Sequence, residues 1–206
     1  MTPENTGKAY DRIADRWNNE TFNRENGITQ HLRALEFLKN GKSALDVGCG
    51  CNGRFFDLLQ EKGFTPEGLD ISSEMIRLAR DKYPDIKLYH TDFCRWDTRK
   101  TYDFITAWDS IWHVPAEDNE AVLEKLFSLL NPGGVCIFTT GGTDTAEEKT
   151  DDYMGPKVYY STLGIPKLLE VINRSGCLLR HFEYDQYPEL HLYLIVQRPE
   201  VDQKAK

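Results

Sequence analysis

Long hydrophobic runs are missing from this sequence of 206 residues. A helix needs roughly 20 consecutive apolar residues to cross a bilayer, and no stretch of the sequence approaches that length. The opening stretch, Met1 to Tyr10, is polar and lacks the apolar segment of a signal peptide. We therefore expect no membrane partner and no secretory signal there.

Basic clusters and paired cysteines are missing as well. The 33 acidic residues outnumber the 25 basic ones, which gives a net charge of −8, and Lys and Arg form no run. Such a surface repels the phosphate backbone of nucleic acids, so we expect no nucleic acid partner. The five cysteines are odd in number and scattered, which indicates reduced thiols and a cytoplasmic location.

The most informative stretch that is present runs from Leu45 to Gly53. An apolar run leads into an amphipathic segment, Arg54 to Lys62, through Gly48, Gly50 and Gly53. This order predicts a strand, a tight turn and a helix start, whose unpaired N–H groups can bind a nucleotide. The glycine spacing also satisfies the dinucleotide fingerprint, so the loop alone leaves an NAD-dependent oxidoreductase open.

Two acids accompany this loop. Asp46 lies at the end of the first expected strand, and Asp70 follows a second apolar run at Gly68–Leu69. An acid at the second position can accept hydrogen bonds from both hydroxyls of a ribose. The stretch Asp46-Val-Gly-Cys-Gly50 resembles the first motif of class I S-adenosylmethionine (SAM) dependent methyltransferases. In that family the acid orders the loop and helps to hold the amino acid end of SAM.

One residue departs from this motif. The family usually has a third glycine where this sequence has Asn52, and Gly53 follows it. Asn tolerates a positive φ better than other non-glycine residues, so we expect the turn to survive the change.

From Ser43 onward the sequence alternates strands and helices, which predicts a parallel sheet. The stretches Leu178–Tyr184 and Leu190–Val196 predict an antiparallel hairpin that closes it. We expect an α/β fold, a Rossmann-like three-layer sandwich with a mostly parallel seven-stranded sheet. The expected strands are 43–47, 66–70, 86–90, 102–108 and 134–140, and the expected helices are 54–62, 73–83, 117–130 and 165–175.

The length suits a single domain, 1–206. Amphipathic patterns predict helices at Tyr10–Trp17 and Thr29–Leu38, ahead of the first strand. We divide the domain into an N-terminal helical cap (1–42), a cofactor-binding core (43–140), a substrate lid (141–160) and a C-terminal helix with hairpin (161–206).

The resemblance to the methyltransferase family covers residues 8–140. Tyr10-Asp-x-x-Ala-x-x-Trp17 is similar to an N-terminal lid whose aromatic residues cover the cofactor. Asp92 matches a position that accepts a hydrogen bond from the adenine amino group, and residues 107–109 match those beside the transferable methyl group. By this resemblance SAM would be bound by Tyr10, Trp17, Asp46, Gly48, Cys49, Gly50, Asp70, Ile71, Met75, Asp92, Phe93, Ala107 and Trp108.

His113 is the first candidate for a general base, followed by His191 and Tyr160. It resembles the second His of a Leu-His-His loop in the family, and histidine titrates near neutrality. A packing histidine under the loop explains it equally well. Cys49 and Cys51 lack further Cys or His residues at zinc spacing, so we predict no metal site.

Gly141 to Tyr160 is the least regular stretch, with several acids followed by tyrosines. A solvated loop is one interpretation. A substrate lid is the other, because long segments at the ligand end of a sheet often cover the site. Acids together with tyrosines would suit a cationic or amine substrate.

The resemblance thus implies an enzyme that transfers the methyl group of SAM to a small-molecule acceptor and releases S-adenosylhomocysteine (SAH). The sulfonium of SAM is already activated, so in-line displacement needs no metal. Two alternatives remain: an NAD-dependent oxidoreductase, against which Asp46 and Asp92 count, and a SAM-binding sensor or assembly protein without catalysis.

Overall fold

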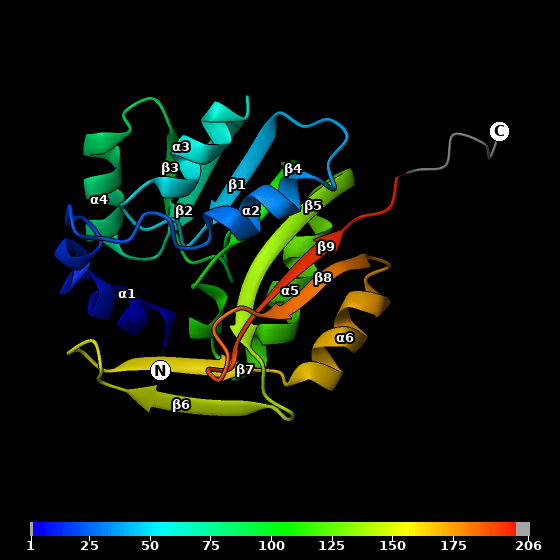
Figure 1. Ribbon diagram of the computed structural model, residues 1–206. Helices are drawn as coiled ribbons and strands as arrows, with labels where there is room; N and C mark the ends of the chain where they lie inside the picture. Colours follow the sequence, from blue (N-terminus) through cyan, green and yellow to red (C-terminus); the bar gives the residue numbers. More distant parts are fainter. Residues whose placement is uncertain (1, 201–206) are drawn as a thin grey trace.

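A seven-stranded sheet forms the centre of the molecule (Figure 1). The computed structural model describes residues 2–200. The strands are β1 (Ser43–Val47), β2 (Thr65–Asp70), β3 (Lys87–His90), β4 (Tyr102–Ala107), β5 (Leu130–Gly141), β8 (Leu178–Tyr184) and β9 (His191–Gln197). Their order is β3-β2-β1-β4-β5-β9-β8, parallel from β3 to β5, with β9 antiparallel to both β5 and β8. The predicted sheet and its closing hairpin are confirmed.

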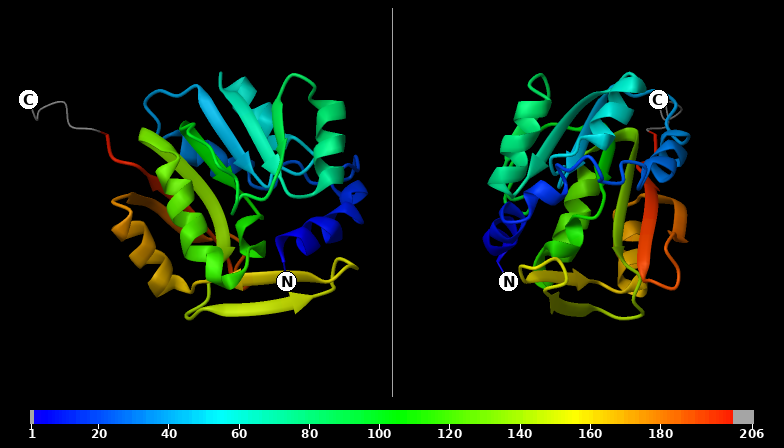
Figure 2. Two further views of the ribbon diagram at one scale, coloured as in Figure 1. Left: turned by 180° about the vertical axis from the view of Figure 1, so that it is seen from behind. Right: turned by 60° about the vertical axis from the view of Figure 1, so that its left-hand side comes forward.

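Helices cover both faces of this sheet and complete the three layers (Figures 1 and 2). α5 (Asn119–Ser128) and α6 (Ile165–Arg174) pack on one face, and α2 (Ile28–Leu35) and α3 (Arg54–Glu61) pack on the other. α4 (Ser73–Lys82) lies beside β3, with α1 (Pro3–Asp11) against it. Of the helices in residues 2–200, none combines the length and the apolar character that a bilayer span requires.

The central strands are apolar on both sides because each side meets a helical layer. In β5, Phe138 packs in the same cluster as Leu126 of α5, whereas the neighbouring Ile137 packs with Phe55 of α3. Successive side chains of a strand point to opposite faces, so both residues are buried. Continuous apolar runs of this kind are typical of parallel strands covered on both faces.

The stretch predicted as the least regular contains two strands, β6 (Glu147–Asp151) and β7 (Val158–Thr162). They pair antiparallel and lie along the carboxyl ends of the parallel strands, beneath α1 in Figure 1. β7 is mostly buried, whereas β6 is mostly exposed. The acidic residues of β6 therefore face solvent. Because β6 is so highly charged, the sequence does not show the apolar pattern that would predict a strand there.

The N-terminal helix begins earlier than the predicted stretch Tyr10–Trp17. Pro3 occupies its first turn, and the side chain of Thr2 accepts a hydrogen bond from the Asn5 N–H, so the helix starts at Pro3. It ends at Asp11, and a separate 3₁₀ turn follows at Ala14–Arg16. Ala14 is buried, and its carbonyl oxygen lies 3.8 Å from Cys51 Sγ of the glycine loop.

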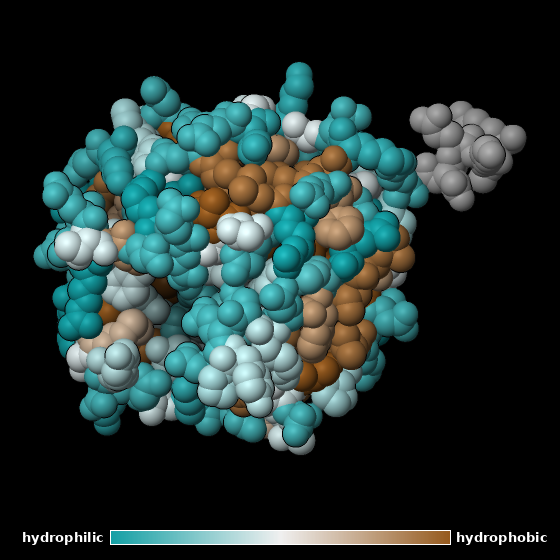
Figure 3. Space-filling view, viewed as in Figure 1, coloured by the Kyte–Doolittle hydropathy of each residue, from teal (hydrophilic) through white to brown (hydrophobic). Residues whose placement is uncertain are grey.

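Apolar side chains gather on one part of the surface over β8 and α6 (Figure 3). Leu178 and Leu179 of β8 are each 41% exposed, and Leu169 of α6 is 38% exposed. β8 is an edge strand of the sheet, remote in strand order from β1 and β2. This apolar patch is therefore separate from the carboxyl ends of β1 and β2, where Asp46 and Asp70 lie.

Candidate active site

A cavity of about 400 Å³ opens at the carboxyl ends of the parallel strands. Its size is that of small-molecule sites in proteins. All the residues predicted to bind the cofactor or to act in catalysis line it, except Ala107. Ala107 is fully buried and belongs to the apolar cluster that the sheet forms with α5 and α6.

The loop after β1 forms the floor of the cavity. Gly48 and Cys49 both donate backbone hydrogen bonds to the carbonyl oxygen of Leu69, which ties the loop to β2. Asn52 does not have a positive φ, since Asp109 is the single non-glycine residue in 2–200 that does; the positive φ values of this loop are those of Gly48, Gly50 and Gly53, at 74°, 56° and 69°. The Asn52 side chain instead accepts from the Arg54 N–H at 3.0 Å and caps α3. The turn survives through the glycine one position later.

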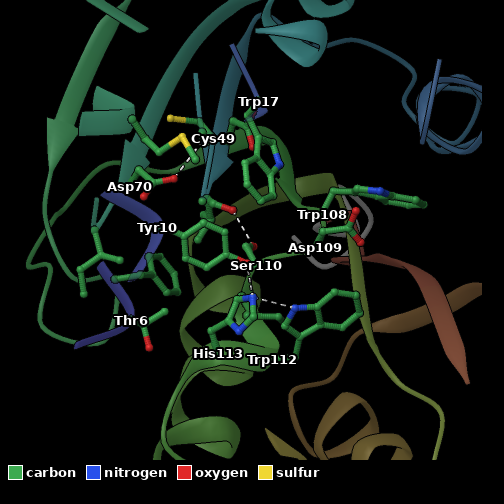
Figure 4. Close-up of a pocket in the computed structure, with 18 of the residues that line it drawn as sticks. Thr6, Tyr10, Trp17, Cys49, Asp70, Trp108, Asp109, Ser110, Trp112 and His113 are labelled. Atoms are coloured by element: carbon green, nitrogen blue, oxygen red, sulfur yellow. Dashed lines mark hydrogen bonds between the residues drawn. The ribbon is translucent and has the colours of Figure 1, made fainter. Parts of the chain in front are cut away.

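Asp70 holds the loop in place from the end of β2 (Figure 4). Its Oδ2 accepts from the Gly50 N–H at 2.9 Å, and its Oδ1 accepts from the Ser72 N–H at 2.8 Å. Burial raises the pKa of this carboxyl, and the backbone N–H groups oppose the increase. Each oxygen keeps a further lone pair, so Asp70 can accept additional hydrogen bonds from a ligand.

Asp46 lies deeper, with 3% of its surface exposed. Burial raises its pKa to about 7, although the positive charge of Arg54 opposes the increase. A cation placed in the cavity would favour the ionised form and so bind more tightly to it. Asp46 is therefore suited to hold a positively charged ligand group.

Three buried side-chain atoms of residues 2–200 lack a hydrogen-bond partner, and all belong to residues that line the cavity. They are Thr6 Oγ1, Asp92 Oδ2 and Trp108 Nε1. Asp92 Oδ1 accepts from the Cys94 N–H, whereas Oδ2 has only Arg95 Nε nearby, at 3.8 Å. Buried polar atoms are normally satisfied, so the free oxygen of Asp92 fits a donor group of a bound ligand.

His113 uses both ring nitrogens in contacts within the protein. Trp112 Nε1, at 3.1 Å, and the Tyr10 hydroxyl, at 2.8 Å, share the lone pair of its Nε2, and its Nδ1 donates to the Tyr159 carbonyl oxygen at 2.8 Å. Burial lowers its pKa to about 4. The imidazole is thus neutral and has no free nitrogen, which favours the packing interpretation over the general base. Tyr160 lies beside it, and burial raises the pKa of that phenol to about 12.

A second histidine borders the cavity with two carboxylates. His191 Nε2 donates to Asp109 Oδ1 at 2.9 Å, and its Nδ1 donates to Asp185 Oδ1 at 2.5 Å. Burial alone would lower the pKa of His191, but the two acids raise it above the ordinary value. The positive φ of Asp109 is 54°, a backbone conformation that is strained for a non-glycine residue, and such strain is often found at functional sites.

Only part of this cluster is assigned a role by the sequence analysis. His191 is the second candidate base, and the resemblance places residue 109 beside the methyl group. Asp185 lies in the turn of the hairpin and carries no local signal, because its contact with His191 appears only once the hairpin has folded.

Comparison with known proteins decides the family. Residues 21–186 match a family model described as a methyltransferase domain. The chain belongs to that family. The resemblance to class I SAM-dependent methyltransferases is thereby confirmed, with methyl transfer as the activity of the family and SAM as its cofactor. The ambiguity of the glycine spacing is settled against an NAD-dependent oxidoreductase.

Several curated methyltransferases are similar to part of the chain. Phosphoethanolamine N-methyltransferase 2 of Caenorhabditis elegans is 26% identical over 161 residues, which cover 73% of this chain and 36% of that protein. A ubiquinone biosynthesis O-methyltransferase of Psychrobacter arcticus is 29% identical, covering 53% of this chain and 45% of that protein. The chain therefore spans less than half the length of these two relatives.

Solved structures with SAH or of SAM-dependent methyltransferases share the fold. The DhpI–SAH complex superposes with a TM-score of 0.71 at 22% identity and covers 96% of this chain and 97% of that one. A SAM-dependent methyltransferase from Clostridium acetobutylicum has a TM-score of 0.68 at 15% identity, covering 92% and 96%.

Proposed function

We propose that this chain transfers the methyl group of SAM to a small molecule enclosed in the cavity, by in-line displacement and without a metal ion. The observation that carries this proposal is the composition of one cavity. Its floor offers carboxylates at successive strand ends, and its walls and roof bring together Tyr10, Trp17, Trp108, Trp112 and Tyr160. Aromatic walls exclude water, which strengthens electrostatic interactions inside.

The cofactor is assigned to the half of the cavity over β1 to β3. Asp70 would accept from the ribose hydroxyls, and the free Oδ2 of Asp92 would accept from the adenine amino group. The ring would lie against Ile71, Met75 and Phe93. Asp46 would face the ammonium group of the amino acid end, and this would ionise the buried carboxyl.

The methyl acceptor is assigned to the other half, over β4 and β9. SAM, when bound, supplies a methyl group on a positively charged sulfur, and this group needs no further activation. Asp109 Oδ1 is engaged with His191, and its Oδ2 makes no hydrogen bond in the described chain. That oxygen can hold an amine or take a proton from a hydroxyl. His113 would hold Tyr10 in the roof rather than act as a base.

Relatives support a small acceptor without deciding which atom is methylated. Their names include N-methyltransferases of phosphoethanolamine and of a dTDP-linked amino sugar, and an O-methyltransferase of ubiquinone biosynthesis. The proposal for this chain is therefore a small-molecule acceptor, with an amine as the class that Asp109 and the aromatic walls suit best.

Calorimetry and a transfer assay test the proposal together. SAH should release heat on binding, whereas NADH should not. SAM labelled at the methyl group should then label a member of a panel of small amines and phenols, equally well with and without a chelator. Binding of NADH alone would refute the cofactor. Transfer that stops in chelator and returns with magnesium would refute the metal-free mechanism.

A further inference from the structure

Asp109 is held at the cavity by contacts from outside its own loop. Its φ of 54° lies in the left-handed region, which is unfavourable for a non-glycine residue. Two contacts stabilise this conformation: the Asp109 N–H donates to Thr139 Oγ1 at 2.7 Å, and Asp109 Oδ1 accepts from His191 Nε2 at 2.9 Å. Thr139 of β5 therefore fixes the backbone of Asp109, and His191 of β9 orients its side chain.

The ring of His191 is fixed in turn. It packs against the indoles of Trp108 and Trp112, with ring centres 5.7 and 5.5 Å away, and 10% of the side chain is exposed. Its Nδ1 donates to Asp185 Oδ1, and Asp185 Oδ2 accepts from Gln30 Nε2 of α2 at 2.9 Å. A hydrogen-bonded chain thus runs from α2 through the turn of the hairpin to the loop after β4.

This chain determines the charge of His191. Both ring nitrogens face carboxylate oxygens, and a carboxylate accepts hydrogen bonds without donating any. Each nitrogen must therefore carry a hydrogen, which makes the ring an imidazolium. Burial alone would lower the pKa of His191, whereas the hydrogen bonds and charges of Asp109 and Asp185 raise it. An imidazolium has no free lone pair, so His191 cannot act as the general base.

Two carboxylates and one imidazolium leave one negative charge at this end of the cavity. Asp109 lines the cavity with its side chain 34% exposed, and its Oδ2 makes no hydrogen bond within residues 2–200. Arg54 interacts electrostatically with Asp109 but forms no ion pair with it in this part of the chain. A free carboxylate oxygen among aromatic walls suits a group with one positive charge.

We propose that His191, an imidazolium clamped by Asp185, is a positioning residue that holds Asp109 so that its free Oδ2 accepts a hydrogen bond from the nitrogen of an amine acceptor. This assignment rests on the proposed function, and it makes the acceptor an amine instead of a phenol. The bond to Oδ2 persists when the ammonium loses one proton to water, because a primary or secondary amine still has an N–H to donate.

Two substitutions of His191 separate its two hydrogen bonds. His191→Gln places an amide N–H near the position of Nε2 and keeps the bond to Asp109, whereas His191→Asn places one near Nδ1 and keeps the bond to Asp185. His181→Asn is the matched control, because His181 also contacts a carboxylate, that of Glu183 at 2.6 Å, but lies on β8 outside the cavity lining. A transfer assay gives KM and kcat for the amine that the wild type methylates best, and calorimetry gives the affinity for SAH.

His191→Asn should raise KM for the amine by roughly 10- to 100-fold, the range for a lost hydrogen bond to a charged group. His191→Gln should raise it by less, and His181→Asn should leave it unchanged. SAH affinity should stay unchanged in all three variants, because the cofactor is assigned to the other half of the cavity.

The pH profile separates positioning from a merely structural role. Asp109 and Asp185 are the charged groups that face His191 within residues 2–200, and its other neighbours, such as Gly141 of β5 and Trp112, are uncharged. The amine titrates identically in every variant, so the ratio of the variant KM to the wild-type KM removes its contribution. For His191→Asn this ratio should shrink as the pH rises through the raised pKa of His191, because the wild type then loses the imidazolium too.

Asp185→Asn decides the question if His191→Asn does not fold. It keeps an oxygen for Nδ1 and removes a charge, so KM should begin to rise at a lower pH than in the wild type. Parallel losses of SAH affinity and amine KM would overturn the proposal, as would a KM ratio independent of pH. A wild type that binds SAH and methylates no amine of the panel would also overturn it. If the wild type does not bind SAH, the proposed function itself fails.

Discussion

Asp46 is a buried acid of the cavity and Asp70 a half-buried one, and they differ in what surrounds them. Asp70 accepts hydrogen bonds from two backbone N–H groups, which favour its ionised form. Asp46 has a pKa of about 7 and lies where a ligand cation is expected. Its charge in the empty protein is therefore a source of instability that binding relieves.

Asp46→Asn should stabilise the unliganded protein at pH 8. An unfolded Asp ionises near pH 3.8, whereas burial keeps Asp46 neutral up to about pH 7. The folded state thus binds more protons between these values, and stability falls as pH rises through this window. Above pH 7, Asp46→Asn should raise the free energy of unfolding by on the order of a few kcal/mol, as follows from the difference between the folded and unfolded pKa values. The gain should vanish near pH 3.8.

Denaturant unfolding at several pH values measures this effect, with the exposed Asp97→Asn as a control. SAH affinity should fall in Asp46→Asn. Equal stability of wild type and variant at pH 8 would mean that Asp46 ionises in the fold without cost.

Gly53→Ala should destabilise the protein more than Gly50→Ala. Both glycines have a positive φ, 69° and 56°, which costs an Ala roughly 1–2 kcal/mol. A Cβ on Gly53 would also lie 2.1 Å from the ring of Tyr83, whereas a Cβ on Gly50 would meet nothing closer than Met75 Sδ at 4.0 Å. The difference between the two losses in the free energy of unfolding measures the cost of the clash with Tyr83. Equal losses would show that the Tyr83 ring moves aside freely.

At the scale of elements, His113 connects α1 to β7. Tyr10 at the end of α1 donates to one ring nitrogen, and the other donates to Tyr159 of β7. Both elements belong to the roof of the cavity, so this histidine fixes how the roof lies over the ligand. The connection requires a neutral ring, because Nε2 must accept.

Tyr10→Phe should loosen α1 while leaving its ring in place. The lost hydrogen bond is worth about 1 kcal/mol, so SAH affinity should fall by at most roughly fivefold. Amide exchange should accelerate in residues 3–11 and stay unchanged in α5, which serves as the internal control. Unchanged exchange in α1 would contradict the role of the bond.

The same histidine gives the roof a pH dependence. The pKa of His113 is lowered from 6.5 to about 4, so the unfolded state binds the proton first and stability rises with pH between these values. Above pH 6.5 this contribution is complete.

Most of the sheet, and the acids at the carboxyl ends of its strands, could be predicted from the sequence for physical reasons. The parallel strands are buried apolar runs, and their order along the chain brings Asp46, Asp70 and Asp92 to one edge. β6 was not predicted because it is exposed and acidic, while the buried residues of this hairpin belong to its partner β7. The cluster of His191 with Asp109 and Asp185 depends on contacts between the hairpin and the loop after β4, which no local pattern records.

For the molecule as a whole, the cavity lies between a fixed sheet edge and a roof from two distant parts of the chain. Residues 3–11 and 158–162, which lie far apart in the sequence, contact each other over it. Ligand binding should therefore raise the unfolding temperature and couple the roof to the core. At 100 times its dissociation constant, SAH should add about 2.7 kcal/mol of stability.

The contact of Cys51 with Ala14 allows the rate at which the cavity opens to be measured. Cys51 is 1% exposed, and burial raises its pKa to about 11, so the closed protein presents almost no reactive thiolate. Alkylation of Cys51, followed by mass spectrometry of its peptide, should proceed only as fast as the segment around Ala14 lifts away. Saturating SAH should slow it, and Tyr10→Phe should speed it, while Cys136 in the core stays unmodified in both. Alkylation of Cys51 at the same rate with and without SAH would mean that this segment does not respond to the ligand. The rate of one chemical reaction would then report how often the site opens, without any knowledge of the methyl acceptor.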